Sequence, residues 1–532
     1  MNLRDASCVV VGLVWLATAS TASAADFYVS AAAAAGGSGS KGSPFRTVQA
    51  AIDASASGDT IRVAAGEYVE NLRVDGKDIV LEGGYDAAFV RDIARNTTTL
   101  KGAGGDSVIN LLAADATVDG FRITGGEGST EEAPFGYHGG GIYSRDGSPT
   151  ITNNTIEEND VRRAGLPSDY HFGGGVHITS APNATITKNV IRRNYAGRGA
   201  GLSVGGEAAL IKGNTIDRNV AIGDHGGGMF IAVVDATITE NIIRRNEVGR
   251  ALGYGWGGGL IVVGQGNSAE LSFNVLYENY AAAYGAAEFI DEGARAEIHH
   301  ELIYRNVSKD GCEAVSAIAV DGGEGVGSRA TISHCTVVNN VCESAIRGNG
   351  LQVEGLSIVS VVNCIFWNNG GDDFATDNTS TLTVTYTNSQ EAIAGAGNIS
   401  VDPKFVDEAT NDYHLAAGSP CIDAGDPTSP FDKEAPVSGG RADMGRYGNA
   451  PASGSAGRDD DDDDDNNNGN DNDNGNNNGN DNDNGDDDNA GSPASPIFCG
   501  TMSPAMMSAC IGMMIIGRRR VTRGRWARYG AC

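Results

Sequence analysis

A short phrase recurs eight times between residues 150 and 370, and it constrains the fold more than any other feature of the chain. In its clearest copy, Ile151 is followed by Asn154, Ile156 and Asn159. The final Asn residues of the copies lie 25 to 35 residues apart: Asn159, Asn194, Asn219, Asn246, Asn279, Asn306, Asn340 and Asn369. A repeat of this length is typical of a solenoid, in which each repeat buries its apolar face against its neighbours.

Apolar and polar residues alternate within each repeat, as in Thr185-Ile186-Thr187 and Thr237-Ile238-Thr239. A period of two with β-branched residues predicts strands rather than helices. No helical pattern separates the copies, so a leucine-rich or other α/β solenoid is excluded. The repeat length fits a coil of three short strands joined by turns. The sequence therefore predicts an all-β parallel β-helix in which inward Ile and Val stack from coil to coil.

A second phrase, rich in Gly, lies between the Asn phrases. Its copies are Gly139-Gly140-Gly141, Gly173-Gly174-Gly175, Gly226-Gly227-Gly228 and Gly257-Gly258-Gly259, with looser copies at 199–201 and 285–287. Gly suits a tight corner before a strand because it takes positive φ and allows close backbone approach. We expect the repeat Asn residues to adopt the left-handed conformation, and their amides to bond turn backbone and the Asn stacked above.

These phrases, together with both ends of the repeat region, resemble the right-handed parallel β-helix family, the pectin-lyase-like superfold, over roughly residues 26–450. Residues 43–52 are similar to its short N-terminal capping helix, 58–68 to its first coil, and 402–425 to the closing segment of bacterial secreted members. The resemblance implies a right-handed parallel β-helix solenoid with a capping helix. It leaves activity open, since this superfold includes lyases, hydrolases, epimerases and pure binders.

The chain divides by composition into four segments. Residues 1–24 have the charge, apolar core and small-residue site of a signal peptide, so we expect export to the extracellular space or the bacterial envelope. Residues 25–455 form the expected β-helix. Residues 456–492 are rich in Asp, Asn and Gly and predict a disordered linker. Residues 493–532 combine a short apolar stretch with an Arg cluster and resemble bacterial C-terminal sorting tails, which implies envelope sorting machinery as a partner.

The formal net charge of −30 excludes nucleic acid as an expected partner. We expect a monomer. Calcium is a candidate cofactor, although no motif requires it, and no zinc-binding Cys spacing is present. Four Cys residues occupy equivalent positions in neighbouring repeats, pairing Cys335 with Cys364 and Cys312 with Cys342. Both pairs are disulfide candidates in an oxidising compartment, and a stack of buried free thiols is the alternative.

The turn between the repeat Asn and the Gly corner varies most in length, which is how a solenoid builds a binding face. The residue directly before each corner is, in order, His138, Phe172, Arg198, His225, Trp256 and Tyr284. If the coils stack in register, these residues form a ladder, with Tyr137, Tyr170, His171, Asp224 and Tyr254 beside it. Aromatic faces with His and Arg suit sugar rings and uronate carboxylates, so the ladder is a candidate substrate-binding surface. The alternative is that the aromatic residues only shield the Gly corner.

Asp224 and His225, with Arg198 one coil earlier, are the best catalytic candidates, and His171 is the next. They match no catalytic signature of polygalacturonases or alginate epimerases. Three hypotheses remain: a polysaccharide-binding or adhesion module on the cell surface, a lyase, epimerase or hydrolase of acidic glycans with an atypical site, and a passive stalk.

Overall fold

The computed structural model describes residues 24–131, 136–162, 170–309, 316–323, 325–342, 350–434, 439–448 and 450. Contacts divide the chain into residues 1–458 and 459–532. The expected linker and tail, and the signal peptide except its last residue, lie outside the described residues. The described part contains no helix with the length and apolar character needed to cross a lipid bilayer.

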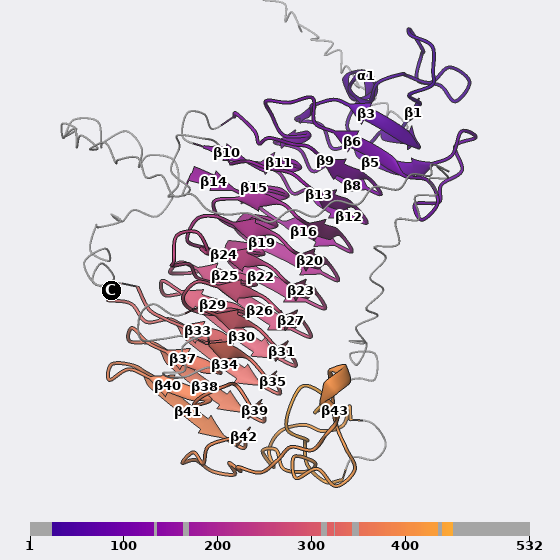
Figure 1. Cartoon of the computed structure of the whole chain (residues 1–532). Coiled ribbons are helices and arrows are strands. Elements are labelled where there is room, and N and C mark those ends of the chain that lie inside the picture. Colours follow the sequence, from indigo (N-terminus) through magenta and orange to yellow (C-terminus); the bar gives the residue numbers. More distant parts are fainter. Residues whose placement is uncertain are drawn as a thin grey trace, which may run out of the picture. The chain divides into compact units, whose positions relative to one another are not determined.

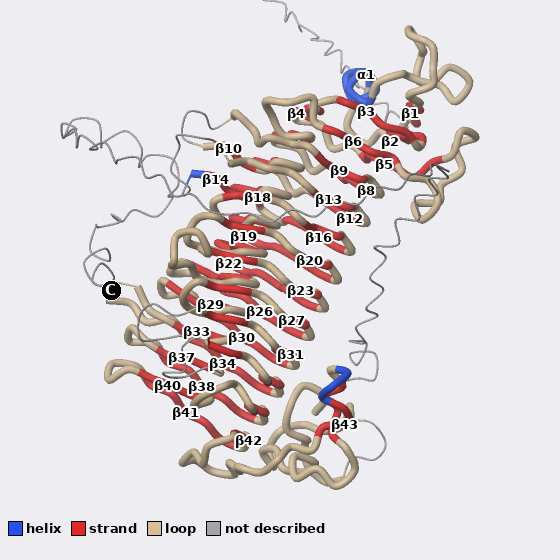
Figure 2. The backbone as a smooth tube through the Cα atoms, in the orientation of Figure 1, coloured by secondary structure: helices blue, strands red, loops and turns tan. Residues whose placement is uncertain are grey.

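Parallel strands stacked coil upon coil form the described structure, as Figures 1 and 2 show. Two rows of strands run along one large sheet of 22 strands, and a bend separates them in most coils. The strands are β1 (Asp26–Val29), β2 (Thr60–Ala64), β4 (Leu72–Asp75), β5 (Val80–Tyr85), β7 (Ile109–Leu112), β8 (Thr117–Asp119), β11 (Ile142–Arg145), β12 (Thr150–Thr152), β15 (Val176–Ala181), β16 (Ala184–Thr187), β19 (Leu202–Lys212), β22 (Met229–Thr239), β25 (Leu260–Val263), β26 (Ser268–Ser272), β29 (Glu288–Asp291), β30 (Arg295–His299), β33 (Ile318–Val320), β34 (Arg329–Ser333), β37 (Leu351–Val353), β38 (Ile358–Val362), β40 (Phe374–Thr376) and β41 (Thr381–Thr385).

Two further parallel sheets complete the coils. The twelve-stranded sheet contains β3 (Gly66–Val69), β6 (Thr98–Lys101), β9 (Arg122–Thr124), β13 (Thr155–Glu157), β17 (Val190–Arg192), β20 (Thr215–Asp217), β23 (Ile242–Arg244), β27 (Val275–Tyr277), β31 (Leu302–Tyr304), β35 (Thr336–Val338), β39 (Ile365–Trp367) and β42 (Asn388–Ser389). The six-stranded sheet contains β18 (Tyr195–Ala196), β21 (Val220–Ala221), β24 (Glu247–Val248), β28 (Tyr280–Ala281), β32 (Val307–Ser308) and β36 (Val341–Cys342). The parallel β-helix expected from the sequence is therefore the fold.

The interior is a continuous stack of apolar side chains. Ile186, Ile211 and Ile238 are in register on adjacent strands and fully buried. Successive strands lie about 4.8 Å apart, so each buried side chain packs on its equivalent in the next coil. The N-terminal end of this stack is covered by helix α1 (Val48–Ala54), which buries Val48, Ala51 and Ile52.

The capping helix is shorter and later than the sequence suggested. Phe45 instead forms a bridge with Val29 of β1, which holds the residues before the helix in an extended conformation. The Glu70 carboxylate accepts the N–H groups of Val48 and Gln49 at 2.9 and 3.0 Å. A side chain from the next turn of the chain thus satisfies the first donors of the helix, a role that capping residues usually perform locally.

Two ladders of buried Asn side chains follow the corners of the coils. The first contains Asn154, Asn189, Asn214, Asn241 and Asn274, and the second contains Asn159, Asn194, Asn219, Asn246, Asn279, Asn306, Asn340 and Asn369. In the second ladder the Asn219 Nδ2 atom donates to Asn246 Oδ1 at 3.0 Å and to the Ile191 carbonyl at 2.9 Å. Asn219 Oδ1 accepts from the backbone N–H and the amide of Asn194. The predicted stacking of Asn amides and their bonds to turn backbone are therefore confirmed.

The left-handed conformation lies one residue before the repeat Asn, so its expected position was wrong. Arg218, Glu240 and Arg245 have φ of 52°, 58° and 54°, whereas the repeat Asn residues do not have positive φ. The corner needs one left-handed residue, and the Asn side chain must point inward to reach the ladder. The outward-facing residue before it therefore takes the conformation. The first Gly of each triplet does have positive φ, as Gly226 at 65° illustrates.

Cys335 and Cys364 continue the first Asn ladder as free, buried thiols. The Cys335 N–H lies 3.4 Å from Cys364 Sγ, in the place of an N–H to amide bond. Of the two alternatives, the structure has the stack of thiols rather than the disulfide, because both side chains point along the inner corner of stacked coils. Cys312 lies outside the described residues, as does the side chain of Cys342.

The C-terminal segment folds back along the outside of the twelve-stranded sheet. It contains an antiparallel pair, β43 (Phe405–Asp407) and β44 (Asp412–Leu415), with a short 3-10 helix, η2 (Glu408–Thr410), between them. Phe405 and Tyr413 pack on a cluster that includes Tyr277 and Tyr304 of the sheet. Arg446, which is almost fully buried, donates to the carbonyls of Phe273 and Asn274.

Candidate functional site

The residues before the Gly corners form the ladder that their spacing suggested. The N–H of each corner Gly donates to the carbonyl of the ladder residue one coil further on. Gly173 bonds Arg198, Gly199 bonds His225, and Gly226 bonds Trp256, at distances of 2.9 to 3.1 Å. The bond from Gly139 to Phe172 and that from Gly257 to Tyr284 extend the series in both directions. Part of the ladder forms a separate two-stranded sheet of β10 (Tyr137–His138) and β14 (His171–Phe172).

A second row of side chains lies beside the ladder, on the outer face of the strands that follow the Gly corners. Strand pairing aligns Tyr143, His177, Ser203, Phe230, Ile261 and Phe289. Phe172 of the ladder packs 5.8 Å from the His177 ring and 5.7 Å from the Phe230 ring. This row was not predicted from the sequence. Its members could have been found by their position, because each is the second residue after a Gly corner.

The two rows together produce a run of aromatic and imidazole rings across three coils. Ring centroids are separated by 5.7 Å from Phe172 to Phe230, 6.3 Å from Phe230 to His225, and 5.2 Å from His225 to Trp256. Tyr254 extends the run from the variable turn, 5.8 Å from Trp256. All five side chains are partly or well exposed. We call this run, Phe172–Phe230–His225–Trp256–Tyr254, the aromatic flank.

Three of the four catalytic candidates meet at this flank. Arg198 binds the Asp224 carboxylate through two bonds, Nε to Oδ1 at 2.6 Å and a terminal nitrogen to Oδ2 at 2.9 Å. His225 Nδ1 lies 2.7 Å from Asp224 Oδ1, at an angle outside that of a hydrogen bond. Burial opposes ionisation of Asp224, but His225 and Arg198 together hold its pKa well below the usual range. Asp224 is therefore an anion with two cationic or polar neighbours.

The fourth candidate, His171, is separate from this group. Its side chain is buried, with its ring 6.2 Å from that of Tyr137, and its backbone carbonyl accepts the N–H groups of Gly197 and Arg198. It therefore fixes the position of Arg198 through backbone bonds rather than facing solvent. The ends of the ladder are also buried, because His138 packs on His177 and Tyr284 stacks on Phe289.

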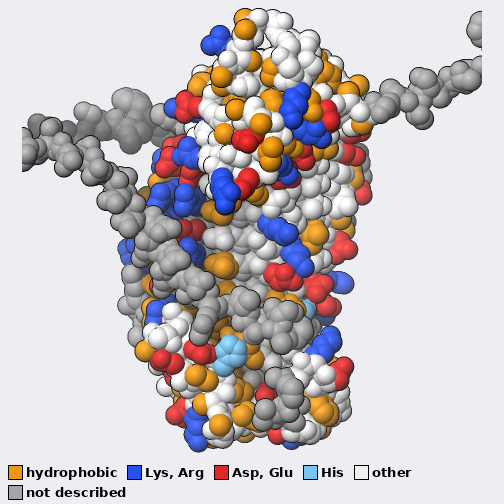
Figure 3. Space-filling view, turned by 90° about the vertical axis from the view of Figure 1, so that its right-hand side faces the viewer, with side chains coloured by type: hydrophobic (Ala, Val, Ile, Leu, Met, Phe, Trp, Pro, Cys, Tyr) orange, Lys and Arg blue, Asp and Glu red, His pale blue; other side chains and the backbone are white. Residues whose placement is uncertain are grey.

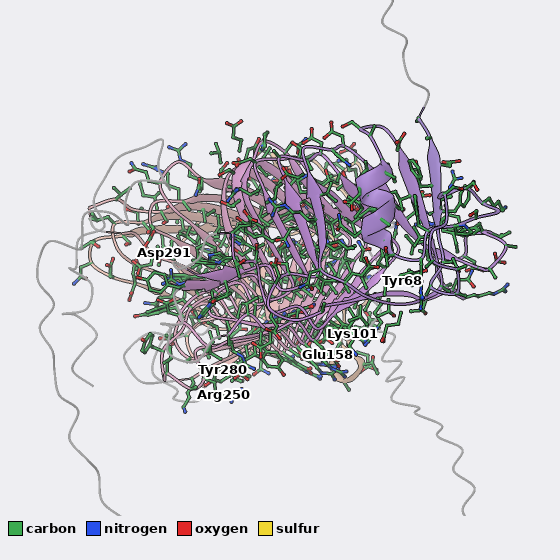
Figure 4. The ribbon with its side chains drawn as sticks, turned by 90° about the horizontal axis from the view of Figure 1, so that it is seen from above. Tyr68, Lys101, Glu158, Arg250, Tyr280 and Asp291 are labelled. Atoms are coloured by element: carbon green, nitrogen blue, oxygen red, sulfur yellow. The ribbon has the colours of Figure 1, made fainter. Side chains whose placement is uncertain are left out.

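Among the remaining binding candidates, Tyr170 and Tyr254 are exposed, and Tyr137 is partly buried against a cluster of small side chains. The turn that carries Tyr254 is fixed by Arg250, which lies 3.7 Å above the Tyr280 ring and 2.7 Å from the Glu247 carboxylate. Figure 4 shows Arg250 and Tyr280 at the same edge of the fold. An exposed ring on an anchored turn is available to a ligand without ordering a loop.

This arrangement is suited to contact with sugar rings. Partly exposed rings present apolar faces, while His225 and Asp224 add polar atoms between them. Arg198 is less suited to a uronate carboxylate than expected, because Asp224 already occupies its guanidinium group. The close pair of His225 and Asp224 is the only part of the flank, within the described residues, that resembles an acid–base pair.

Within the described residues, no group of three or more His, Cys, Asp or Glu side chains is arranged to hold a metal ion. A calcium site is therefore not identified by geometry in this part of the chain. Charged side chains of both signs are interspersed on the face presented in Figure 3, where Lys and Arg lie among Asp and Glu.

Comparison with known proteins agrees with the class that the fold defines, a β-helix solenoid. Residues 99–285 match a family model described as the right handed beta helix region. This match agrees with the parallel β-helix that the stacked strands form and with the resemblance of the repeat phrases. No curated protein sequence matches the chain.

Solved structures similar to the chain include three with low sequence identity. A structure described as pectate lyase Pel9A has 14% identity and a TM-score of 0.40, covering 80% of this chain and 96% of its own. XylC in complex with xylose has 12% identity and a TM-score of 0.46, covering 72% and 87%. An alginate lyase from Paenibacillus sp. str. FPU-7 has 15% identity and a TM-score of 0.31, covering 67% and 97%.

Proposed function

We propose that this chain is an exported polysaccharide-binding or adhesion protein that holds its ligand on the aromatic flank. The observation that supports this proposal is the run of five partly exposed rings, from Phe172 to Tyr254, with neighbouring centroids 5.2 to 6.3 Å apart. Rings spaced at this interval provide several apolar faces on one surface, as a chain of sugar residues requires. Binding through stacking needs no catalytic group and no metal.

Export and surface display belong to the same proposal. The signal peptide at 1–24 leads the chain out of the cytoplasm, and the tail at 493–532 engages the envelope sorting machinery. The acidic linker at 456–492 then holds the β-helix away from the surface, where the aromatic flank meets glycans. Calcium remains a candidate cofactor, which the binding assay below tests.

A second candidate function is a lyase, epimerase or hydrolase of acidic glycans. It is favoured by one contact, the 2.7 Å approach of His225 Nδ1 to Asp224 Oδ1, which brings an imidazole and a carboxylate together as acid–base chemistry requires. Against it stands the engagement of Arg198 by Asp224, so this guanidinium group is not available to neutralise a uronate carboxylate. The third candidate, a passive stalk, does not explain a run of exposed rings.

The test combines binding and turnover on the same samples. The purified protein is incubated with uronate and neutral polysaccharides, with and without calcium, and assayed for retention on immobilised glycan and for ultraviolet absorbance of unsaturated products and released reducing ends. We expect retention without product. Trp256→Ala, which removes the largest ring of the flank, should weaken retention about tenfold. Phe431→Ala, which removes an exposed ring outside the flank, is the matched control.

Product formation that falls about 10²–10⁴-fold in His225→Gln would establish the enzyme instead. Retention that is equal in the wild type and in Trp256→Ala would exclude the flank as the binding surface. Neither retention nor product across the panel would leave the stalk as the explanation.

A further inference from the structure

A hollow of about 640 Å³ lies at the bend between the two rows of strands in the large sheet. The bend is at the far end of β25, β29 and β33 from the Gly corners, so the hollow is distinct from the aromatic flank. Its described lining comes from consecutive coils and includes the turns at 265–266 and 325–328, with Gly293 between them. Glycine in these turns keeps the hollow open, because few side chains project into it.

Two arginines line the hollow side by side. Arg295 on β30 and Arg329 on β34 are partners in the strand register, so their backbones are about 4.8 Å apart and their side chains leave the same face. Both are exposed. Like charges directly opposite each other on neighbouring strands are destabilising. A pair of this kind therefore requires a reason other than stability.

Neither arginine has an acidic partner in the described structure, although most outward arginines of the neighbouring sheet do. Arg192 lies 2.7 Å from Glu157 and Arg244 lies 3.4 Å from Asp217. By contrast, no described side chain forms an ion pair or hydrogen bond with Arg295 or Arg329. The nearest acidic groups along these strands, Glu270 and Glu297, lie two residues further on, and neither comes within 4.0 Å of an arginine in the pair.

The other walls of the hollow are a free amide and exposed apolar side chains. Gln265 has no hydrogen-bond partner for its side chain among the described residues, and it faces the same space. Leu356 and Ile358 line the hollow with 49% and 43% of their surfaces exposed. Leu356 also has a φ of 66°, which is costly for a residue with a branched side chain.

We propose that this hollow binds an organic oxyanion, the carboxylate or sulfate group of an acidic sugar. Two adjacent guanidinium groups supply paired N–H donors that match the oxygens of such a group. The Gln265 amide adds a polar contact, and Leu356 with Ile358 faces the carbon skeleton of the sugar. The site is independent of the aromatic flank, since it uses other residues and a different corner of the coil.

The test measures binding of three short oligosaccharides by calorimetry: an oligogalacturonate, a sulfated oligosaccharide and a neutral oligosaccharide of the same length. The wild type should bind at least one charged probe and not bind the neutral one. The double variant Arg295→Gln and Arg329→Gln should lose at least tenfold in affinity. Both positions lie on exposed faces of strands, so the fold is expected to persist, which the thermal transition verifies.

The matched control is Arg305→Gln, which removes an exposed arginine of the same coil from a different corner. It should bind as the wild type does. Trp256→Ala should also retain binding of the short charged probes, which separates this site from the aromatic flank. Preference for the carboxylate or the sulfate probe identifies the group. Equal affinity in the double variant, equal binding of the neutral probe, or no binding of either charged probe would overturn the proposal.

Discussion

Glu288 is a carboxyl group inside the apolar interior. Strand register places it between Leu260 and Ile318, and its side chain is fully buried. Glu301, equally buried, takes the position of an Asn in the first ladder and accepts the amide of Asn274 at 2.6 Å. Burial first, and then the neighbouring Glu301, raise the pKa of Glu288 well above its ordinary value. Glu288 therefore retains its proton in the folded chain.

Replacing Glu288 with Leu should raise the free energy of unfolding by about 1–3 kcal/mol at neutral pH, because a poorly bonded buried carboxyl is removed. The effect should depend on pH. Unfolded Glu288 loses its proton near pH 4.5 while the folded side chain keeps it, so the wild type loses stability as pH rises above that value. Denaturant unfolding of both forms across this range measures the difference.

Glu297→Leu, at an exposed position of β30, is the control and should change neither the stability nor its pH dependence by a similar amount. If Glu288→Leu is less stable than the wild type at neutral pH, the interior carboxyl is bonded better than the structure shows.

Asn219 in the middle of the second ladder should be far more important for stability than surface residues of its coil. Asn219→Ala removes its amide bonds and leaves the amide and N–H of Asn194 without their acceptor. We expect a loss of about 2–3 kcal/mol in the free energy of unfolding, from thermal or denaturant melts. Lys212→Ala, exposed on the adjacent β19, should lose less than about 0.5 kcal/mol. Equal effects would show that the ladder does not stabilise the coil stack.

The sequence predicted these Asn residues well because their spacing and chemistry point to one role. It did not reveal the left-handed residue before them, since Arg218, Glu240 and Arg245 share no composition that favours that conformation. Glu288 was missed for a related reason. A single acidic residue at an apolar repeat position is visible only once the strand register is known.

The C-terminal segment contacts a stack of histidine side chains on the outside of the coils. The His300 ring lies between Phe273 and His334, with centroids 4.9 and 5.0 Å away. A ring nitrogen of His300 is 2.9 Å from the Gly448 carbonyl of the segment, and His299 lies 3.0 Å from its other nitrogen. Burial, with the neighbouring histidines, lowers the pKa of His300 to about 3 and that of His334 to about 4.

Acid should therefore weaken the attachment of this segment. The unfolded imidazoles take up protons below about pH 6.5, whereas the folded ones resist protonation until about pH 3 to 4. Stability is then complete above pH 6.5 and is lost as pH falls through that window, by up to about 1.4 kcal/mol per pH unit for each ring. Arg446, buried close to the stack, adds repulsion when the rings become charged.

The double variant His300→Gln and His334→Gln should show a shallower loss of stability between pH 6.5 and 4, measured by denaturant unfolding and by limited proteolysis after residue 398. His414→Gln, which changes a partly exposed histidine of the segment itself, should behave as the wild type. An unchanged acid profile in the double variant would mean that other groups control release of the segment.

The sequence predicted the position of the closing segment but not the residues that it contacts. Residues 402–425 resemble a family ending, yet nothing in their order indicates that Phe405 and Tyr413 would cover Tyr277 and Tyr304. The ladder of residues before the Gly corners was also predicted only in part. Its register followed from spacing, whereas the burial of His138, His171 and Tyr284 depends on the second row of side chains that packs against them.

For the whole molecule, stability should be a sum over coils and their interfaces, as in other solenoids. Deletion of residues 202–228 joins Gly201 to Met229, and strand register shows that Leu202 and Met229 are equivalent. The shortened chain should fold with all its remaining ladders continuous and melt cooperatively at a lower temperature. Deletion of residues 202–214 removes about half a coil, breaks the register and should abolish folding. Circular dichroism melts distinguish the two outcomes, and folding of both would argue against coil-by-coil stacking.

The fold was predictable at this scale because one repeated phrase specifies every coil. The hollow at Arg295 and Arg329 was not, because it combines strand residues with turns of irregular length that share no phrase. A repeated sequence phrase therefore predicts the fold, whereas the candidate sites lie where the coils depart from the repeat.

The side-chain amides of the Asn ladders share one orientation along the axis of the solenoid. In the run of Asn residues, each amide accepts through its oxygen from the Asn before it and donates one N–H to the Asn of the next coil, so these amide-to-amide bonds all run the same way along the axis. The run of Asn amides in each ladder is followed by a carboxyl group: Asn274 donates to Glu301, after which thiols continue the first ladder, and Asn369 donates to Asp373 at 2.8 Å. An acidic side chain thus accepts the last amide N–H of each row of Asn residues. The backbone of such a sheet has only a small net dipole. The ordered side-chain amides add a dipole along the axis of the coils.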